Sequence, residues 1–517
     1  MKSKKVIGVI FILFLFVVSL MRAQVTNPSV PCMCDPLAPP ASGESVVTVN
    51  NLTQLQNEII SATGPKTIYI ASGVYDGTLA PYASSGVVCE IMKSDITIRS
   101  VTGNPNDVVI DCGAFDTSRI AVPPYGDYPG VLYGFVIADW LYGVSDTLRN
   151  ITIADITVRD ARNHNISIEG DYHPQNIKIH NVVLINAGQQ LIKVNSNNLN
   201  NPTAVSNGII ECSTLKFETT TCLSFHTQNG WYTNGVDIHA GREWIIRYNR
   251  FENIITHPAG IALPAGAAIL IWSNSVNCIT EGNEIINCDR GIEYGNWGHI
   301  DASFFDNSGG IIRNNSIRGK IGWKNSYDAD YNGPAFEGSK IGISLCNSVN
   351  VKVFNNSVYN PSNYNDDRVR SLDLQGWKVQ GCEFSNNLLL RKPRIIGGTI
   401  SYNNAWSNNF WDATSACNYS SNQLLSMFNN ANGIVPDLHL TSAASSAINA
   451  GTNLTAWPND LDNQVSADGM RDIGADERNS VVNSTPCAAT TNTNFAALNP
   501  AAFTTLFSAS PSKTGTI

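Results

Sequence analysis

From Asn163 to Leu390 the chain repeats one short phrase of alternating apolar and polar residues. Each phrase holds two short apolar runs, and the second run ends in Asn-rich segments such as Ile312-Arg-Asn-Asn. Alternation with a period of two predicts strands with one buried face, and its recurrence predicts stacked copies of one unit. Equivalent apolar positions lie 26 to 41 residues apart, at Leu184, Leu215, Phe251, Ile285, Ile317, Val358 and Phe384. The unequal spacing indicates a constant coil that carries loops of variable length.

Short strands separated by Asn and Gly, without helices between them, favour a parallel solenoid in which each coil pairs with the next. We therefore predict an all-β fold, a right-handed parallel β-helix. A β-sandwich or a propeller also has many short strands and is the alternative. Sandwich strands lack this registered two-strand phrase, so the solenoid is favoured.

Segments at both ends of the repeats are predicted to cap the solenoid, because an open end would expose strand edges and core. Residues 46–60 have the pattern of a strand followed by an amphipathic helix, and residues 66–77 that of a strand and a turn. Near the other end, residues 436–452 and Arg471-Asp-Ile-Gly-Ala-Asp-Glu477 predict a C-terminal cap. The β-helix with its caps is thus expected over residues 44–477. Residues 478–517, rich in Ser, Thr and Asn, are predicted to be a linker, and their last stretch resembles the start of a type IX secretion sorting domain.

The first residues have the pattern of an export signal. Three lysines precede the apolar run from Val6 to Leu20, and a cut is predicted after Ala23, so that residues 1–23 form a signal peptide. The run is short for a membrane span. Residues 24–43 form a leader that contains Pro and Cys. We expect a protein that is secreted or held at the cell surface.

Export permits disulfides among the 12 cysteines. Cys32 and Cys34 of the leader are the candidates for such bonds. The cysteines within the repeats are predicted to be small apolar residues that fill the interior; these are Cys212, Cys278, Cys288 and Cys382.

Charge narrows the choice of partner. Charged residues make up 15% of the chain and the net charge is −9, so no nucleic-acid partner is expected. A polysaccharide, including an acidic one, remains compatible through a local basic patch. Because both ends of the solenoid are predicted to be capped, we expect a monomer.

Outward positions of the first strand of each coil carry the candidate chemistry, because stacking in register places equivalent residues about 4.8 Å apart. One outward column contains Ser167, Lys193, Asp237, Leu270, Glu293, Ser344 and Asp373. The column beside it contains Glu169, Asn195, His239, Trp272, Gly295, Cys346 and Gln375. The connections around these columns add His226, Trp231, Arg242, His257, Arg290, Trp297 and His299.

Cations, imidazoles and indoles on one face suit an acidic sugar chain, since indoles stack on sugar rings and Lys or Arg pairs with uronate or sulfate. We predict that Trp272, His226, Trp231, Trp297, His299 and Arg290 bind substrate. In β-elimination, a cation neutralises the uronate carboxylate, a base removes the C5 proton and an acid protonates the leaving oxygen. His239 is the candidate base or acid, and Arg242 and Lys193 are the candidate cations. Asp237, His257 and Glu293 are further catalytic candidates.

The opening at residues 46–60 resembles the N-terminal cap of the pectate-lyase-like superfamily, particularly that of the chondroitinase B and alginate lyase family. Val236-Asp-Ile-His-Ala-Gly241 is similar to that family's catalytic strand, which implies a polysaccharide lyase. The chain also departs from the family. His239 stands where the family has an essential Arg, and Lys193 lies two positions from the place of its essential Lys. Residues that match the family's Asn and Glu calcium ligands are absent, so the resemblance implies a shared scaffold with a different mechanism.

Other activities remain open. The pectate-lyase motif Arg-x-Pro-x-x-Arg is matched only in part by Arg391-Lys-Pro-Arg394, and the polygalacturonase motifs are absent. A hydrolase could use Asp237 and Glu293, which the stacking places about 10 Å apart, near the separation of about 6.5–9.5 Å in inverting enzymes. A non-catalytic adhesin or glycan-binding protein is the alternative from another class. Chemically different residues are concentrated in a few coils beneath the longest loops. This concentration favours an enzyme.

No metal ligand is predicted among the site residues, and the cofactor is left unknown, with calcium as one possibility. Asp460, Asp462 and Asp468 have the residue type that calcium prefers. Carboxylates that form turns are the commoner explanation for such residues.

Overall fold

The computed structural model describes residues 34–114, 130–140, 147–196, 205–218, 233–255, 266–296, 305–319, 341–359, 370–389, 393–395, 401–402, 405–411, 426–431, 437–452, 459–462, 464–466, 468–478 and 480–481. The predicted signal peptide, residues 24–33 of the leader and most of the predicted linker lie outside these residues. Within them, no helix is both long and apolar enough to cross a membrane.

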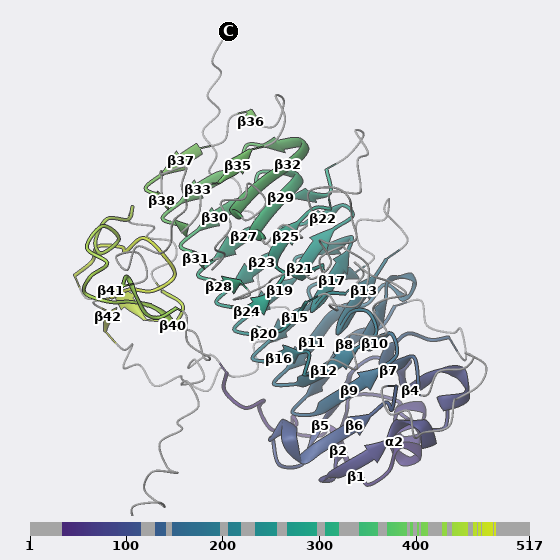
Figure 1. Ribbon diagram of the computed structural model, residues 1–517. Coiled ribbons are helices and arrows are strands. Elements are labelled where there is room, and N and C mark those ends of the chain that lie inside the picture. Colours follow the sequence, from purple (N-terminus) through teal and green to yellow (C-terminus); the bar gives the residue numbers. More distant parts are fainter. Residues whose placement is uncertain are drawn as a thin grey trace, which may run out of the picture.

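The chain folds as a right-handed parallel β-helix, as predicted (Figure 1). Every solenoid strand pairs in parallel with its equivalent in the next coil, and the strands line three faces. The first face carries the predicted site and consists of β4 (Val87–Ile91), β7 (Tyr133–Ile137), β10 (His164–Glu169), β13 (Ile192–Asn195), β17 (Val236–His239), β21 (Ala267–Trp272), β25 (Arg290–Tyr294), β29 (Ile341–Val349), β32 (Arg370–Gln380) and β35 (Arg394–Ile395).

The second face belongs to the same 27-stranded sheet. It consists of β1 (Ser45–Val49), β2 (Lys66–Ile70), β5 (Ile96–Ser100), β8 (Arg149–Ala154), β11 (Gln175–His180), β15 (Ile209–Glu211), β19 (Ile245–Arg247), β23 (Ile279–Glu281), β27 (Ile311–Arg313), β30 (Lys352–Phe354), β33 (Glu383–Ser385) and β37 (Ala405–Ser407). Short strands lie between the two faces, namely β14 (Val205–Ser206), β18 (Gly241–Arg242), β22 (Ser275–Val276), β26 (Asn307–Ser308) and β36 (Ser401–Tyr402).

The third face is a separate 11-stranded sheet. It consists of β3 (Gly73–Asp76), β6 (Val108–Asp111), β9 (Thr157–Ala161), β12 (Val183–Ala187), β16 (Thr214–Lys216), β20 (Arg250–Glu252), β24 (Glu284–Cys288), β28 (Ser316–Gly319), β31 (Ser357–Tyr359), β34 (Leu388–Leu389) and β38 (Phe410–Trp411). The inward residues of all three faces form one continuous apolar core, which includes the predicted apolar positions Leu184, Leu215, Phe251, Ile285, Ile317, Val358 and Phe384.

The Asn-rich segments of the sequence form the turns between the second and third faces. The first Asn of a pair, such as Asn314 or Asn355, has a positive φ, which Asn tolerates better than most residues. The second Asn is buried and stacks on its equivalent in the next coil. These ladder residues are Asn249, Asn283, Asn315, Asn356, Asn387 and Asn409. From Asn283 onward, each side-chain oxygen accepts from the backbone and side-chain N–H groups of the Asn before it, and that of Asn249 accepts from the backbone N–H of Ser213.

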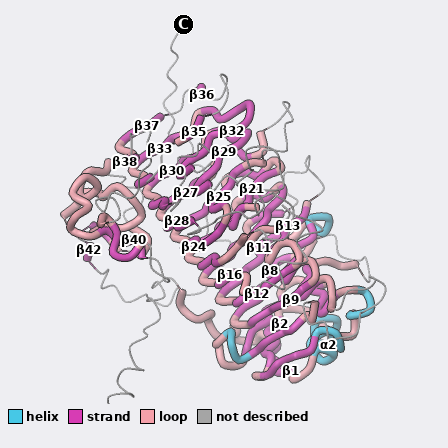
Figure 2. The backbone as a smooth tube through the Cα atoms, viewed as in Figure 1, coloured by secondary structure: helices cyan, strands magenta, loops and turns pink. Residues whose placement is uncertain are grey.

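The predicted N-terminal capping helix is α2 (Leu52–Ile60), which lies at the N-terminal end of the solenoid (Figure 2). The Asn51 side chain accepts from the backbone N–H of Gln54 and so caps the helix. Leu52, Leu55 and Ile59 are buried against the first coils. Short 3-10 turns follow at η2 (Gly77–Leu79), η3 (Ala83–Ser85), η4 (Pro105–Asp107) and η5 (Gly170–Tyr172).

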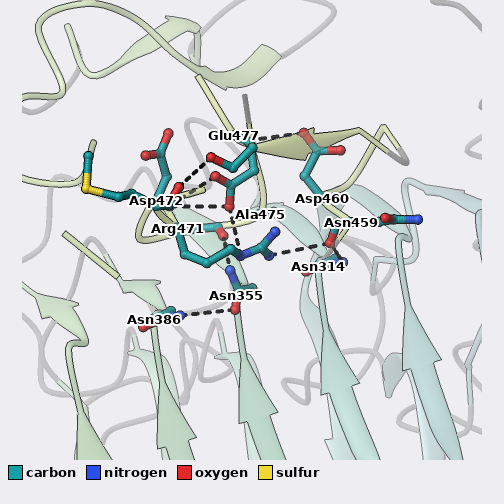
Figure 3. Close-up of polar contacts among 12 residues, drawn as sticks. Asn314, Asn355, Asn386, Asn459, Asp460, Arg471, Asp472, Ala475 and Glu477 are labelled. Atoms are coloured by element: carbon teal, nitrogen blue, oxygen red, sulfur yellow. Dashed lines mark hydrogen bonds and ion pairs between the residues drawn. The ribbon is translucent and has the colours of Figure 1, made fainter. Parts of the chain in front are cut away.

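The C-terminal cap (residues 426–481) contains β39 (Phe428–Asn430), β40 (Asp437–Leu440), β41 (Val465–Ser466) and β42 (Ser480–Val481), and lies against the flank of the last coils (Figure 1). The positive-φ asparagines of three successive coils dock it. Asn314 donates to the Asn459 carbonyl at 2.7 Å, and Asn386 donates to the Thr452 carbonyl at 2.8 Å. Asn355 donates to the carbonyl of Gly474 at 3.4 Å (Figure 3).

The cysteine prediction was wrong at one position. Cys212, expected to fill the interior, forms a disulfide with Cys34 of the leader. It occupies the turn between β15 and β16 with a positive φ, and it is partly exposed there. Cys278, Cys288 and Cys382 are buried free thiols, as predicted. Burial raises the pKa of Cys278 to about 12, so this thiol stays protonated. Cys32 lies outside the described residues.

Candidate functional site

The predicted outward column exists along the first face. Ser167 pairs with Lys193, Lys193 with Asp237, and Asp237 with Leu270. The register continues through Glu293, Ser344 and Asp373. In the second column, Glu169 pairs with Asn195 and His239 pairs with Trp272. Period-two alternation and in-register stacking therefore bring residues from distant parts of the sequence onto adjacent coils.

Four of these residues form one contact group on β13, β17 and β21, which we call the site cluster: Lys193, Asp237, His239 and Trp272. The Lys193 ammonium donates to Asp237 Oδ2 at 2.5 Å, and its Nζ lies 2.7 Å from His239 Nε2. Trp272 Nε1 donates to Asp237 Oδ1 at 2.8 Å. The rings of His239 and Trp272 meet edge to face, with centroids 4.5 Å apart.

Asp237 is the fixed anion of the cluster. Its side chain is 3% exposed, and Lys193, Trp272 and Gln190 all donate to it. Burial alone would raise the pKa of the Asp237 carboxyl, but the charge of Lys193 and its hydrogen bond outweigh burial and hold the pKa well below its usual range. Asp237 therefore remains a carboxylate that orients its neighbours, and it does not take up a proton at neutral pH.

His239 is the member of the cluster best placed to exchange a proton with a ligand. Its side chain is 14% exposed, whereas that of Lys193 is 7% exposed. An ammonium can only donate, so the 2.7 Å contact assigns the lone pair to Nε2 and the ring proton to Nδ1. A longer contact of 3.4 Å between Nε2 and Asp237 Oδ1 would require the opposite assignment, and the shorter contact is the better hydrogen bond. Nδ1 has no partner among the described residues.

Arg242 follows His239 after a turn in which Ala240 has a positive φ. Its side chain makes no ion pair with any residue in the described part of the chain, and its Nε is buried without a hydrogen-bond partner there. Burial lowers the pKa of the guanidinium from its usual value. An anion bound at this position would offset that cost of burial.

The preceding coil adds two titratable groups, both on β10. Glu169 accepts from Ser167 at 2.6 Å and from Asn195 at 3.4 Å, and burial raises the pKa of its carboxyl. His164, at the start of β10, was missed by the sequence analysis. Burial lowers the pKa of its imidazole to about 3, and the charge of Lys193 acts in the same direction. Its ring lies beside that of Tyr133, with centroids 5.5 Å apart, and this contact follows from no repeated position of the phrase.

Glu293 lies two coils beyond Asp237 and is separated from it by Leu270. Arg290 donates to Glu293 at 3.1 Å. Burial raises the pKa of the Glu293 carboxyl although Arg290 opposes this. Neither residue contacts the site cluster through a hydrogen bond or ion pair between described residues. Further along this face, Arg394 forms a two-point ion pair with Asp373.

The other predicted substrate-binding and catalytic residues, namely His226, Trp231, His257, Trp297 and His299, lie outside the described residues, as does Arg391. Their roles stay predictions.

Within the described part of the chain, one group of side chains has the spacing of metal ligands, and it lies in the C-terminal cap rather than at the site cluster. This group is His439, Asp462 and Asp476. Of the acidic residues considered for calcium, Asp460 accepts from the backbone N–H groups of Asp462 and Gln464. Asp468 likewise accepts from the backbone N–H of Met470. These contacts are typical of turn-forming carboxylates.

No protein-family model matches the chain, and no curated protein matches it. Among solved structures, the chain is similar to an alginate lyase from Paenibacillus sp. str. FPU-7, with 13% identity, a TM-score of 0.40, and coverage of 71% of this chain and 99% of that one. The pectate lyase Pel9A is 14% identical, with a TM-score of 0.40 and coverage of 84% and 98%. PfbA, a surface adhesin of Streptococcus pneumoniae, is 12% identical, with a TM-score of 0.36 and coverage of 69% and 87%.

The fold is a parallel β-helix, and this follows from the strand pairing of the chain itself. Identities and TM-scores this low say nothing of activity. The function has to be argued from the residues of the first face.

Proposed function

We propose that this chain is a secreted or cell-surface polysaccharide lyase that cleaves an acidic, uronate-containing glycan by β-elimination on the first face. The observation that carries the proposal is the position of Lys193 between the Asp237 carboxylate and Nε2 of His239. Arg242 follows His239 by three residues in the sequence, and its guanidinium makes no ion pair with any described residue. The expected monomer would act alone, with the glycan lying across β13, β17 and β21.

Arg242 would bind the uronate carboxylate. The positive charge of Lys193 is already matched by Asp237, so it contributes little to a second anion. Arg242 has no such match among the described residues. A guanidinium that pairs with a carboxylate through two N–H groups would both neutralise the uronate and orient it. Neutralisation of that carboxylate is the requirement for removing the neighbouring C5 proton.

Lys193 and His239 would exchange the proton that the reaction needs. Lys193 donates to Nε2 in the protonated pair, and this pair becomes active after it has lost one proton to solvent. Nδ1 then accepts the C5 proton while Nε2 passes its proton to Lys193. The Nδ1–H next protonates the leaving oxygen as the C4–O bond breaks and the C4–C5 double bond forms, and Lys193 returns a proton to Nε2. The proton taken from C5 equals the one given to the leaving oxygen, so the cycle balances. Asp237 stabilises the ammonium that this exchange regenerates.

A hydrolase based on Asp237 and Glu293 fits less well. Asp237 is saturated by donors and nearly inaccessible, so it can neither activate a water molecule nor donate a proton. Glycan binding without catalysis is the second candidate, because a buried Lys193–Asp237 pair would also occur in a site with a purely structural role.

The test is the ultraviolet absorbance of unsaturated uronate while the purified protein is incubated with alginate, polygalacturonate and chondroitin sulfate. We expect product from at least one glycan, with a rate lowered about 100-fold or more by His239→Ala and by a comparable factor by Arg242→Ala. Arg318→Ala is the matched control. Arg318, on β28 of the third face, is buried, has a pKa lowered by burial, and makes no ion pair within the described residues. Absence of product and of new reducing ends, with retained binding of one glycan, would replace the lyase by the glycan-binding protein.

A further inference from the structure

A second group of functional side chains lies in the C-terminal cap, away from the site cluster. His439 in β40, Asp462 in the turn at residues 459–462, and Asp476 in the segment 468–478 come from three separate stretches of the chain. One ligand atom from each of these residues lies within 4.8 Å of the others. Asp476 is buried, whereas His439 and Asp462 are partly exposed, so the group is open to solvent on one side.

The His439 ring is held in one orientation. Its Nδ1 lies 2.6 Å from Asp437 Oδ1, and its Nε2 lies 2.7 Å from Asp462 Oδ2. A carboxylate that fixes one ring nitrogen, so that the other faces further carboxylates, is the outer-shell arrangement that protein metal sites use. Asp476 is fixed as well, since its Oδ2 accepts from the backbone N–H of Leu440 at 2.7 Å.

Negative charge exceeds positive charge in the described part of the cap. Its carboxylates are Asp437, Asp460, Asp462, Asp468, Asp472, Asp476 and Glu477, whereas its permanently cationic side chains are Arg471 and Arg478. Four of the carboxylates, Asp460, Asp472, Asp476 and Glu477, are buried. Arg471 forms an ion pair with Glu477 at 3.0 Å (Figure 3). Of these four, Asp476 belongs to the group with the spacing of metal ligands, and it accepts a hydrogen bond from the backbone N–H of Leu440. A cation bound there would offset the cost of burying this carboxylate.

We propose that His439, Asp462 and Asp476 bind one divalent transition-metal ion, with Zn²⁺ as the expected occupant. One imidazole and two carboxylates fit zinc, which binds nitrogen and oxygen ligands at about 2.0–2.2 Å. Calcium fits poorly because it takes six to eight oxygen ligands. In a tetrahedral site the ligand atoms stand about 3.3 Å apart. His439 Nε2 and Asp462 Oδ2 would therefore separate by roughly half an ångström, and Asp476 would close inward. A water molecule would complete the four ligands.

The metal would join the three stretches of the cap and strengthen its docking on the solenoid. Ala475, next to Asp476, donates its backbone N–H to Ser357 Oγ of β31 at 2.9 Å. Gly474 donates its backbone N–H to the Asn386 carbonyl at 2.8 Å. An ion that binds only the folded cap stabilises it by mass action. The proposal concerns the cap alone and does not depend on the activity of the first face.

The experiment is a titration of the metal-free, full-length mature protein with Zn²⁺, followed by metal analysis after dialysis and by the unfolding temperature. We expect one ion per chain and a rise in unfolding temperature, both lost in His439→Gln and Asp462→Asn. Asp468→Asn, an exposed carboxylate of the same cap, is the matched control and should keep both. The proposal would be overturned if the wild type takes up no more Zn²⁺ than His439→Gln does, whether both bind the ion or neither does. His439 and Asp462 would then form an ordinary ion pair.

A second readout uses the unaltered protein, because a variant can fail to fold. Co²⁺ in a four-ligand site with an imidazole gives intense visible absorption, which Zn²⁺ should abolish and Ca²⁺ should not. A spectrum like that of aqueous Co²⁺, or displacement by Ca²⁺ at equal concentration, would contradict the site.

Discussion

At the scale of single residues, the charged side chains of the first face differ in how completely they are paired with opposite charges. Lys193 and Asp237 neutralise each other inside the wall of the solenoid, and Trp272 and Gln190 complete the shell of the carboxylate. Arg242, a few residues further on, has no such match among the described residues. In our account Lys193 and Asp237 therefore position the site, and Arg242 binds the anionic group of a ligand.

His164 makes the folded state sensitive to acid. Burial lowers the pKa of its imidazole to about 3 from an ordinary value of 6.5, with Lys193 acting in the same direction and Asp237 opposing it. Below about pH 6.5, the His164 imidazole therefore binds a proton in the unfolded chain but stays neutral in the folded chain. This contribution to stability is present above about pH 6.5 and is lost as the pH falls towards 3, at up to about 1.4 kcal/mol per pH unit.

Denaturant unfolding measured between about pH 7 and pH 4 tests this origin of acid sensitivity. His164→Gln is expected to lower stability at neutral pH and to make the free energy of unfolding fall less steeply than that of the wild type below pH 6.5. Parallel pH profiles for the two proteins would show that other groups cause the acid sensitivity.

At the scale of elements, the turn between the second and third faces recurs from coil to coil. The two residues of its Asn-Asn pair have different roles. The first Asn takes the positive φ, and in three coils its side chain docks the C-terminal cap. The second Asn is buried and continues the ladder. The sequence predicted that Asn-rich segments end the strands, since Asn favours turns. It did not predict the cap on the flank, because that contact depends on carbonyl groups more than 60 residues away along the chain.

Removing one rung of the ladder should be costly. Asn283→Ala leaves the Ile246 carbonyl and both N–H donors of Asn249 without their partner. A buried polar group left unsatisfied costs about 1–3 kcal/mol, so we expect a loss of roughly 3 kcal/mol in the free energy of unfolding. Asn106→Ala, at an exposed position of η4, is the control and should change stability by less than about 0.5 kcal/mol. Equal effects of the two substitutions would mean that the ladder contributes no more than a surface turn.

At the scale of the whole molecule, contacts between distant segments complete the solenoid. The alternation of the sequence was enough to place Lys193, Asp237 and Glu293 in one column, because stacking in register is a local rule applied coil by coil. It could not pair Cys34 with Cys212, which are 178 residues apart and share no local pattern. Nor could it show that Asp237 is saturated by donors, since Gln190 belongs to no repeated position of the phrase.

The disulfide between Cys34 and Cys212 should stabilise the fold by restricting the unfolded chain. Peptide mapping without reductant is expected to recover the linked pair. Replacing both cysteines by Ser should lower the free energy of unfolding by about 2–4 kcal/mol. Reductant should reproduce this loss in the wild type and add little to the double variant. Full stability of the double variant would show that the leader contributes nothing to the fold.

The most direct test of the central claim is the binding of a uronate oligosaccharide, measured by calorimetry in the wild type, Arg242→Ala and Arg318→Ala. The account predicts that Arg242→Ala weakens binding at least 10-fold and that Arg318→Ala binds like the wild type. Added salt should reduce the difference in affinity between the wild type and Arg242→Ala. Equal affinity of all three proteins, or an equal loss in both variants, would contradict the assignment of an acidic-glycan site to the first face.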